Sequence, residues 1–110
     1  MPASFELKTN ENDHFYFNLL DSDGGLLMMS GEYPEKEAAE QAIKDVQVGS
    51  LMSDQIAAGQ VDGGNTFFVI KDQAGDVLVK SILFNSRMLF DSALHTVKDN
   101  TCIAEVVDHT

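Results

Sequence analysis

Alternating apolar residues along residues 14–20 and 26–33 predict two neighbouring strands of a sheet. In the segment HFYFNLL, Phe17 and Leu19 share one face of an extended chain, because successive side chains point to opposite sides. The polar, glycine-containing stretch DSDGG at 21–25 separates the two segments and favours a tight hairpin turn. We therefore expect an antiparallel hairpin in this part of the chain.

A helix is predicted directly after this hairpin, over PEKEAAEQAIKDVQ at residues 34–47. Pro34 suits a first helical turn, and the acidic residues beside it favour the positive end of the helix dipole. The residues that form one apolar stripe at helical spacing are Ala39, Ala42, Ile43 and Val46. A shorter apolar segment, Phe5 to Lys8, predicts a strand before the hairpin. The first 52 residues thus read β-β-β-α.

The same order of elements returns 51 residues later. Residues 65–100 align with residues 14–49 without a gap, and seven of the 36 positions are identical. Ordinary composition would give about two identities. The identical pairs are Phe17/Phe68, Asp21/Asp72, Gly24/Gly75, Leu27/Leu78, Ser30/Ser81, Ala42/Ala93 and Val46/Val97. Two copies are too few for an open solenoid, so we expect two small units around one core.

The fold class predicted from this pattern is α+β, a tandem duplication of a β-β-β-α unit. Residues 1–52 form the first repeat, and residues 53–110 form the second repeat with a final strand at 101–107. Because hairpins dominate, we expect mainly antiparallel sheets with two helices packed on them and halves related by a pseudo-twofold axis. The second predicted helix, residues 85–100, has the larger apolar residues, and we expect it to be the more deeply buried one.

Both faces of the predicted hairpins carry apolar residues, whereas a sheet with one face in water should alternate. One explanation is that the other repeat covers the second face. The other is that a protein partner or a second copy of this chain binds the face formed by Leu27, Met29 and Tyr33. Flexible methionine side chains suit adaptable surfaces. Both explanations stay open at this point.

The composition is strongly acidic, with 18 acidic against 7 basic residues and a net charge of −11. A field of that sign repels phosphates, so we expect no nucleic-acid partner. The acidity itself fits solubility, an origin in a salty habitat, or a basic partner. No apolar run approaches the roughly 20 residues of a membrane span, so we expect no membrane partner. The first six residues lack the features of a secretory signal, which favours the cytoplasm.

Candidate chemistry is sparse. Cys102 is the one cysteine, so no intrachain disulfide forms, and its apolar neighbours in TCIAEVV predict a small buried side chain. The three histidines, His14, His95 and His109, lack the spacing of a metal or catalytic site. We therefore assign no catalytic residue, no cofactor and no metal.

Two further motifs have structural explanations. Ser30 and Ser81 occupy matching strand ends, which predicts a side chain bonded to the backbone or a small residue needed under a helix. Asp21, Asp23 and Glu32 stand at positions one, three and twelve of a calcium loop. Leu26, however, takes the position where such a loop needs glycine, so the hairpin is the better interpretation.

The turn, strand and helix together resemble one known family. Gly24-Gly25 is followed by Ser30-Gly31-Glu32-Tyr33 and then by a helix with Ala38, Ala42, Ile43 and Val46. This pattern resembles the YegP-like family, small bacterial proteins with one or two copies of a domain of unknown function. The resemblance covers about residues 4–107. It implies a compact fold of two related halves, each packing a helix on antiparallel strands, and it supplies no catalytic residues.

The function expected from these observations is a non-enzymatic protein-interaction module. The alternative is a small-molecule-binding or enzymatic domain with its pocket at the junction of the two repeats. The two differ in one feature, since an interaction surface is open and a ligand pocket is deep.

Overall fold

The computed structural model describes residues 3–110, and Met1 and Pro2, with which the predicted first repeat begins, lie outside the described residues. Strands and helices follow one another in the expected order. They are β1 (Ser4–Thr9), β2 (Phe15–Leu20), β3 (Leu26–Ser30), α1 (Lys36–Gly49), β4 (Ile56–Gln60), β5 (Thr66–Lys71), β6 (Val77–Ser81), α2 (Arg87–Asn100) and β7 (Glu105–Asp108). Short 3-10 turns, Ser53–Gln55 and Thr101–Ile103, precede β4 and β7.

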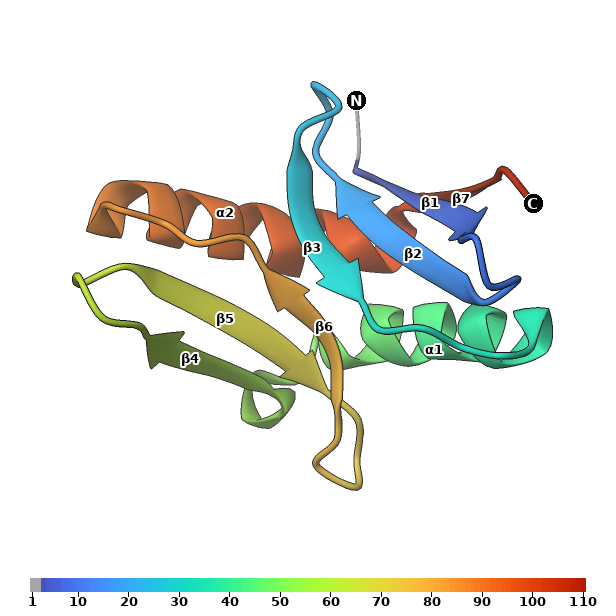
Figure 1. The fold of residues 1–110 in the computed structure, drawn as a ribbon. Coiled ribbons are helices and arrows are strands. Elements are labelled where there is room, and N and C mark those ends of the chain that lie inside the picture. The colour runs from blue at the N-terminus through green and yellow to red at the C-terminus, as the bar shows by residue number, and fades with distance from the viewer. Residues whose placement is uncertain (1–2) are drawn as a thin grey trace.

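The strands form one seven-stranded sheet in the order β4-β5-β6-β3-β2-β1-β7 (Figure 1). All neighbours are antiparallel except β1 and β7, which pair in parallel. The predicted α+β class with mainly antiparallel strands is confirmed. The final strand was expected, but its return to the edge of β1 was not.

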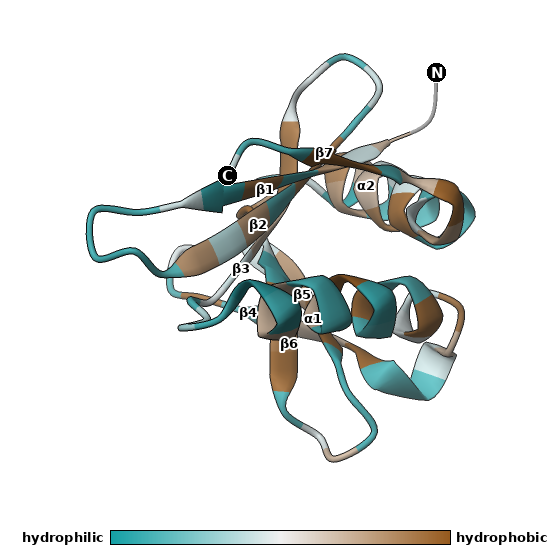
Figure 2. Cartoon of the chain, turned by 90° about the vertical axis from the view of Figure 1, so that its right-hand side faces the viewer, coloured by the Kyte–Doolittle hydropathy of each residue, from teal (hydrophilic) through white to brown (hydrophobic). Residues whose placement is uncertain are grey.

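Both helices lie on the same side of this sheet (Figure 2). Phe5 and Leu7 of β1 illustrate the covered face, since both are fully buried while Glu6 and Lys8 between and beyond them are not. The expectation that one repeat would cover the second face of the other is wrong. The two sets of strands join edge to edge through β3 and β6, so the face away from the helices is covered by neither.

The pairing of β3 with β6 is centred on Met29 and Lys80. These two residues lie opposite each other, and they are also 51 positions apart in the sequence. The flanking pairs are Met28–Ser81 and Ser30–Val79. Val79 and Ser81 are the counterparts of Met28 and Ser30 at the offset of 51, so each flanking pair is the counterpart of the other. The register at the middle of the sheet is therefore symmetric about the Met29–Lys80 pair.

Each hairpin turn is held by an aspartate at its start. Asp21 Oδ1 accepts hydrogen bonds from the backbone N–H groups of Asp23 and Gly25, at 2.9 and 2.8 Å. Asp72 Oδ1 does the same 51 residues later, and the glycines at the tips, Gly24 and Gly75, have φ of +85° and +92°. Side chains with a Cβ rarely adopt this conformation, which explains the glycines. The hairpin interpretation of the acidic stretch is confirmed.

The two matching serines fix the ends of β3 and β6. Ser30 Oγ accepts from Phe17 N at 2.8 Å and donates to the carbonyl of Gly31. Ser81 Oγ accepts from Phe68 N at 2.9 Å and donates to the carbonyl of Ile82. The predicted bonding of these side chains to the backbone is confirmed.

The first helix, α1, is the more deeply buried, so the opposite expectation is wrong. Its contacts extend from β2 across the centre of the sheet to β5 and β6, and its small residues allow this close approach. The buried residues of α1 are Ala39, Ala42, Ile43, Val46 and Gly49. In α2 only Phe90, Ala93 and Val97 are buried. Larger side chains on α2 thus lie partly in solvent instead of deeper in the core.

Cys102 is exposed, which corrects the prediction of a buried side chain. The segment expected to be one continuous strand begins with the 3-10 turn Thr101–Ile103, and only its last part pairs with β1. The turn buries Thr101 and Ala104 and directs Cys102 outward. The apolar segment TCIAEVV therefore does not form a strand along its whole length.

The burial of α1 predicts a difference between two equivalent truncations. Ile43 is 2% exposed and Leu94, its counterpart on α2, is only partly buried. Ile43→Ala should lower the free energy of unfolding by about 2–5 kcal/mol, because it leaves a cavity in the core. Leu94→Ala should cost less. Denaturant titration of both variants measures this, and equal losses would contradict the assigned asymmetry.

The hydrogen bonds of the two serines predict which of two alanine substitutions is the more destabilising. Ser81 is almost fully buried, so Ser81→Ala leaves the Phe68 N–H without a partner and should cost about 1–3 kcal/mol. Ser30→Ala should cost less, since Ser30 is only half-buried and water reaches its position. Thermal denaturation of the two variants gives the comparison. A larger loss for Ser30→Ala would show that solvent access does not decide the cost.

Candidate functional site

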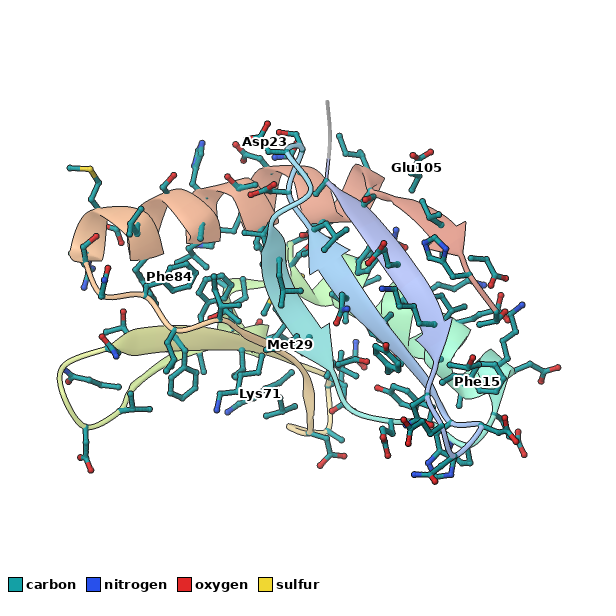
Figure 3. All side chains as sticks on the ribbon, turned by 45° about the horizontal axis from the view of Figure 1, so that its top comes forward. Phe15, Asp23, Met29, Lys71, Phe84 and Glu105 are labelled. Carbon is teal, nitrogen blue, oxygen red and sulfur yellow. The ribbon has the colours of Figure 1, made fainter. Side chains whose placement is uncertain are left out.

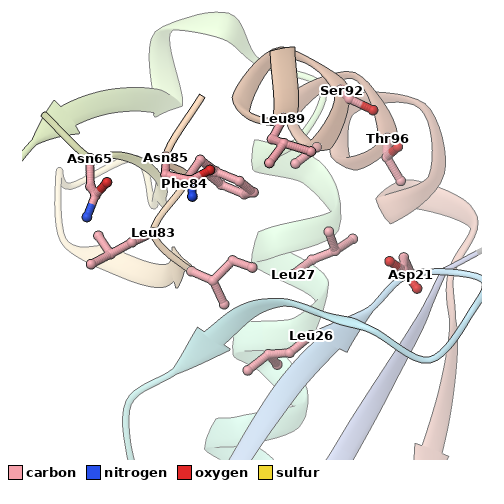
Figure 4. Close-up of a pocket in the computed structure, with 12 residues that line it drawn as sticks. Asp21, Leu26, Leu27, Asn65, Leu83, Phe84, Asn85, Leu89, Ser92 and Thr96 are labelled. Atoms are coloured by element: carbon pink, nitrogen blue, oxygen red, sulfur yellow. The ribbon is translucent and has the colours of Figure 1, made fainter. Parts of the chain in front are cut away.

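An open groove of about 500 Å³ lies at the junction between the first and second sets of strands (Figure 4). We call it the junction groove. Its wall residues come from the β2–β3 turn and the start of β3, from the residue before β5, from the segment between β6 and α2, and from one stripe of α2. They are Asp21, Leu26, Leu27, Asn65, Ile82, Leu83, Phe84, Asn85, Leu89, Ser92, Ala93 and Thr96.

Backbone hydrogen bonds fix the two sides of the groove relative to each other. Ile82 N donates to the carbonyl of Leu27 at 3.1 Å, which ties the chain after β6 to β3. Phe84 and Thr66 exchange two backbone bonds of 2.8 and 2.9 Å. On the opposite side, Ser86 is the N-cap of α2, the helix that carries Leu89, and Ser86 Oγ accepts a hydrogen bond from Leu89 N. The groove is thus built on secondary structure and not on a free loop.

The middle of the groove is apolar and accessible. Leu83 is 50% exposed and Leu89 is 54% exposed, although both are large aliphatic residues. Leu26 is half-buried beside them, and Leu27 and Phe84 form the floor with little exposure. The middle of the groove therefore offers apolar side chains that a partner would cover.

The ends of the groove are polar. Figure 4 shows Asp21 and Thr96 at one end, and Asn65 near Leu83 at the other. Asp21 is the one charged residue among those that line the groove. Because its Oδ1 already holds the hairpin turn, the carboxylate is fixed in place while Oδ2 is left for a further donor.

Different side chains occupy the positions 51 residues earlier. Leu83 corresponds to Glu32, Leu89 to Ala38 and Thr96 to Asp45. Phe84 corresponds to Tyr33, whose pKa is raised above its ordinary value of 10.0 by burial and then by the negative charges of Asp45 and Asp72. A separate cavity of about 400 Å³ includes Asp45 and Asp72 in its wall. The junction groove is therefore mainly apolar, whereas this second cavity, which we call the acidic junction site, contains the counterparts of Thr96 and Asp21, namely Asp45 and Asp72.

The interaction surface predicted from the sequence was Leu27, Met29 and Tyr33, and the structure does not bring these residues together. Leu27 is buried in the floor of the junction groove. Met29 is 41% exposed on the sheet face that carries no helix (Figure 3). Tyr33 stacks on Phe17, with ring centroids 6.3 Å apart.

A β-bulge explains why strand alternation failed there. Leu19 pairs with Met28 and Leu20 with Leu26, so Leu27 is an extra residue between two paired positions. The extra residue changes the direction of the side chains that follow. The residues that sequence reasoning missed are Leu83 and Leu89. A comparison of the two halves at the offset of 51 could have found them, because neither leucine has an apolar counterpart of similar size in the first half.

Within residues 3–110, no group of three or more His, Cys, Asp or Glu side chains is arranged to hold a metal ion. The histidines lie beside separate acidic residues: His14 next to Glu32, His95 next to Asp99 and His109 next to Glu6. Over the same residues, every helix is too short or too polar to cross a bilayer.

Comparison with known proteins identifies the group to which this architecture belongs. A family described as a domain of unknown function, DUF1508, matches residues 10–50. A UPF0339 protein of Pseudomonas aeruginosa is 28% identical over 110 residues, which is the full length of both chains. The UPF0339 protein YegP of Escherichia coli K12 is 24% identical, again over both full lengths. Over its full length the chain is similar to proteins of the YegP-like family.

Two solved structures share the fold of this YegP-like chain. The solution NMR structure of a UPF0339 protein from Shewanella oneidensis superposes with a TM-score of 0.93, is 24% identical, and covers 98% of this chain and 92% of its own. The solution NMR structure of Escherichia coli YegP, described as a protein of unknown function, gives 0.91 at 24% identity and covers 100% and 95%. These likenesses establish the seven-stranded α+β fold and leave the function to the geometry of the site.

The acidic junction site of the YegP-like chain gives a prediction for Tyr33. The chain has two tyrosines, so Tyr16→Phe leaves Tyr33 as the one tyrosine to observe. In this background Asp45→Asn should lower the pKa of Tyr33, because it removes a negative charge that opposes ionisation. Tyrosinate absorbance against pH measures the midpoint. Asp62→Asn is the control, and an equal midpoint in the Asp45 and control variants would contradict the assignment.

Proposed function

We propose that this YegP-like chain is a non-enzymatic protein-interaction module and that its docking site is the junction groove. The observation that carries the proposal is the half-exposed pair Leu83 and Leu89, which face an open groove next to Leu26. Leaving such side chains in water gives up the hydrophobic stabilisation that a covering partner would supply. The surface of Leu27, Met29 and Tyr33 expected from the sequence stays a prediction, and the groove shares Leu27 with it.

The fold itself does not require these leucines. At the matching positions of the first half, Glu32 and Ala38 support the same strand end and the same helix start. The residues that hold the fold, such as Ser30 and Ser81, are by contrast kept in both halves. The internal comparison therefore supports a role for Leu83 and Leu89 outside folding.

The openness of the groove favours a macromolecule over a small ligand. A small-molecule site typically encloses most of its ligand's surface. Here two of the main apolar contacts, Leu83 and Leu89, are about half in solvent before anything binds. The alternative, a ligand or active site at the junction, shares the location but lacks the enclosure. The net charge of −11 supports a protein rather than a nucleic acid as the partner. The single cysteine fits the proposed cytoplasmic location.

A tandem duplication of the units 1–52 and 53–110 is part of this proposal. It is supported by the repeated element order, the matching aspartate turns and serine bonds, and the register centred on Met29 and Lys80. A duplication joined by a pseudo-twofold axis gives two equivalent junction sites. The side chains at one of these sites can then differ from those at the other without a change of the fold.

Affinity capture with matched variants tests the proposed docking site. The double variant Leu83→Ser/Leu89→Ser should lose a stoichiometric protein partner captured from a lysate of the source organism. Control variants are Leu51→Ser and Ile103→Ser, whose apolar side chains are 62% and 65% exposed but lie outside the groove, and they should keep the partner.

Each of these surface substitutions should change the free energy of unfolding by about 0.5 kcal/mol or less. Partner loss can therefore be separated from unfolding by a thermal denaturation curve on the same samples. A partner that is retained equally by the double variant and by the controls would contradict the proposed site.

A further inference from the structure

We infer that the segment which docks in the junction groove is amphipathic and basic, with an apolar side chain between the leucines and a Lys or Arg at Asp21. This inference rests on the proposed function and adds the chemistry of the partner. The occupant is a segment of another protein, because the groove is open and extends along one face of α2. Leu89 and Thr96 are seven residues apart on α2, which corresponds to about 10 Å.

The position of Asp21 supplies the first argument. Its carboxylate stands at one end of the apolar stretch and is the one charge in the groove wall. The hairpin turn uses Oδ1 to accept from Asp23 N and Gly25 N. The second oxygen is therefore held at a fixed point without an entropic cost at binding, and a cationic donor is the group it binds best.

The charges around the groove supply the second argument. On α2, Arg87 Nε lies 3.1 Å from Asp91 Oδ1, and His95 Nε2 lies 2.9 Å from Asp99 Oδ2. With these two side chains beside aspartates, Lys98 in the last turn is the remaining basic residue of the helix that forms one wall. The chain as a whole carries −11, which attracts a basic segment and repels an acidic one. A second copy of this chain is disfavoured for the same reason.

The acidic junction site shows that a fixed carboxylate alone does not define the proposed binding site for a basic segment. Asp72 has the same turn geometry as Asp21, with Oδ1 accepting from Ala74 N and Asp76 N. The positions that match Leu83 and Leu89, however, are Glu32 and Ala38. The walls around Asp72 include Val48 and Met52, which are 55% and 46% exposed, but not a pair of exposed leucines like that of the junction groove. Asp72 is therefore the internal control for Asp21.

Selection from a random peptide library displayed on phage tests the inference with the full chain as target. Peptides are kept when they bind the wild type and not Leu89→Ser, so that only groove-dependent binders remain. We expect these peptides to contain an apolar residue together with Lys or Arg. Selected peptides are then synthesised, and their affinity is measured by fluorescence anisotropy.

The decisive variant is Asp21→Asn, which keeps the oxygen that holds the turn and removes the charge. The selected peptides should bind it about two- to fivefold more weakly than the wild type, as for a partly exposed ion pair, and the difference should shrink in high salt. Asp72→Asn should bind as the wild type does. Thermal denaturation of both variants checks that the two turns remain equally stable.

The outcomes separate the two proposals. Groove-dependent peptides without basic residues, or with equal affinity for Asp21→Asn, would overturn the basic-partner inference and leave the docking site in place. A second copy of the chain bound through the groove, seen as dimers in light scattering that Leu89→Ser abolishes, would also overturn it. The absence of any peptide that depends on Leu89 would overturn both proposals.

Discussion

The antiparallel pairing of β3 with β6 is the interaction on which the rest of the structure depends. Three strands and one helix bury little apolar surface by themselves, and this pairing joins two such sets into one sheet. Because the sheet is continuous, α1 packs across its centre and contacts strands of both sets. The same pairing brings the β2–β3 turn next to the chain after β6, and thereby creates the junction groove.

The symmetry of that pairing makes the differences between the two halves informative. Residues that fix backbone geometry, such as Asp21 and Asp72, are the same in both. Residues around the junction differ, with leucine at 83 and 89 where the first half has Glu32 and Ala38. This difference supports the proposal that the apolar groove is a docking site.

Much of this fold could be predicted from the sequence, because its signals are local. Turn glycines, strand alternation and helical spacing defined nearly all the elements, and the offset of 51 predicted the serine bonds. Edge-to-edge joining could not be predicted, since apolar residues on both strand faces equally suggested face-to-face packing. The bulge at Leu27 hid the true direction of its side chain. Strand alternation therefore grouped Leu27 with Met29 and Tyr33 in one surface, whereas comparing Leu89 with its counterpart Ala38 would have indicated the groove.

Amide hydrogen exchange under native conditions tests most directly the central claim, that one sheet joined at β3 and β6 holds both halves together. The slowest-exchanging amides of β2 and β5, which lie one strand away on either side of the junction, should open with the same free energy, equal to that of global unfolding. Such agreement would mean that both halves unfold as one unit. Two distinct opening free energies, one for β1–β3 and another for β4–β6, would contradict the claim.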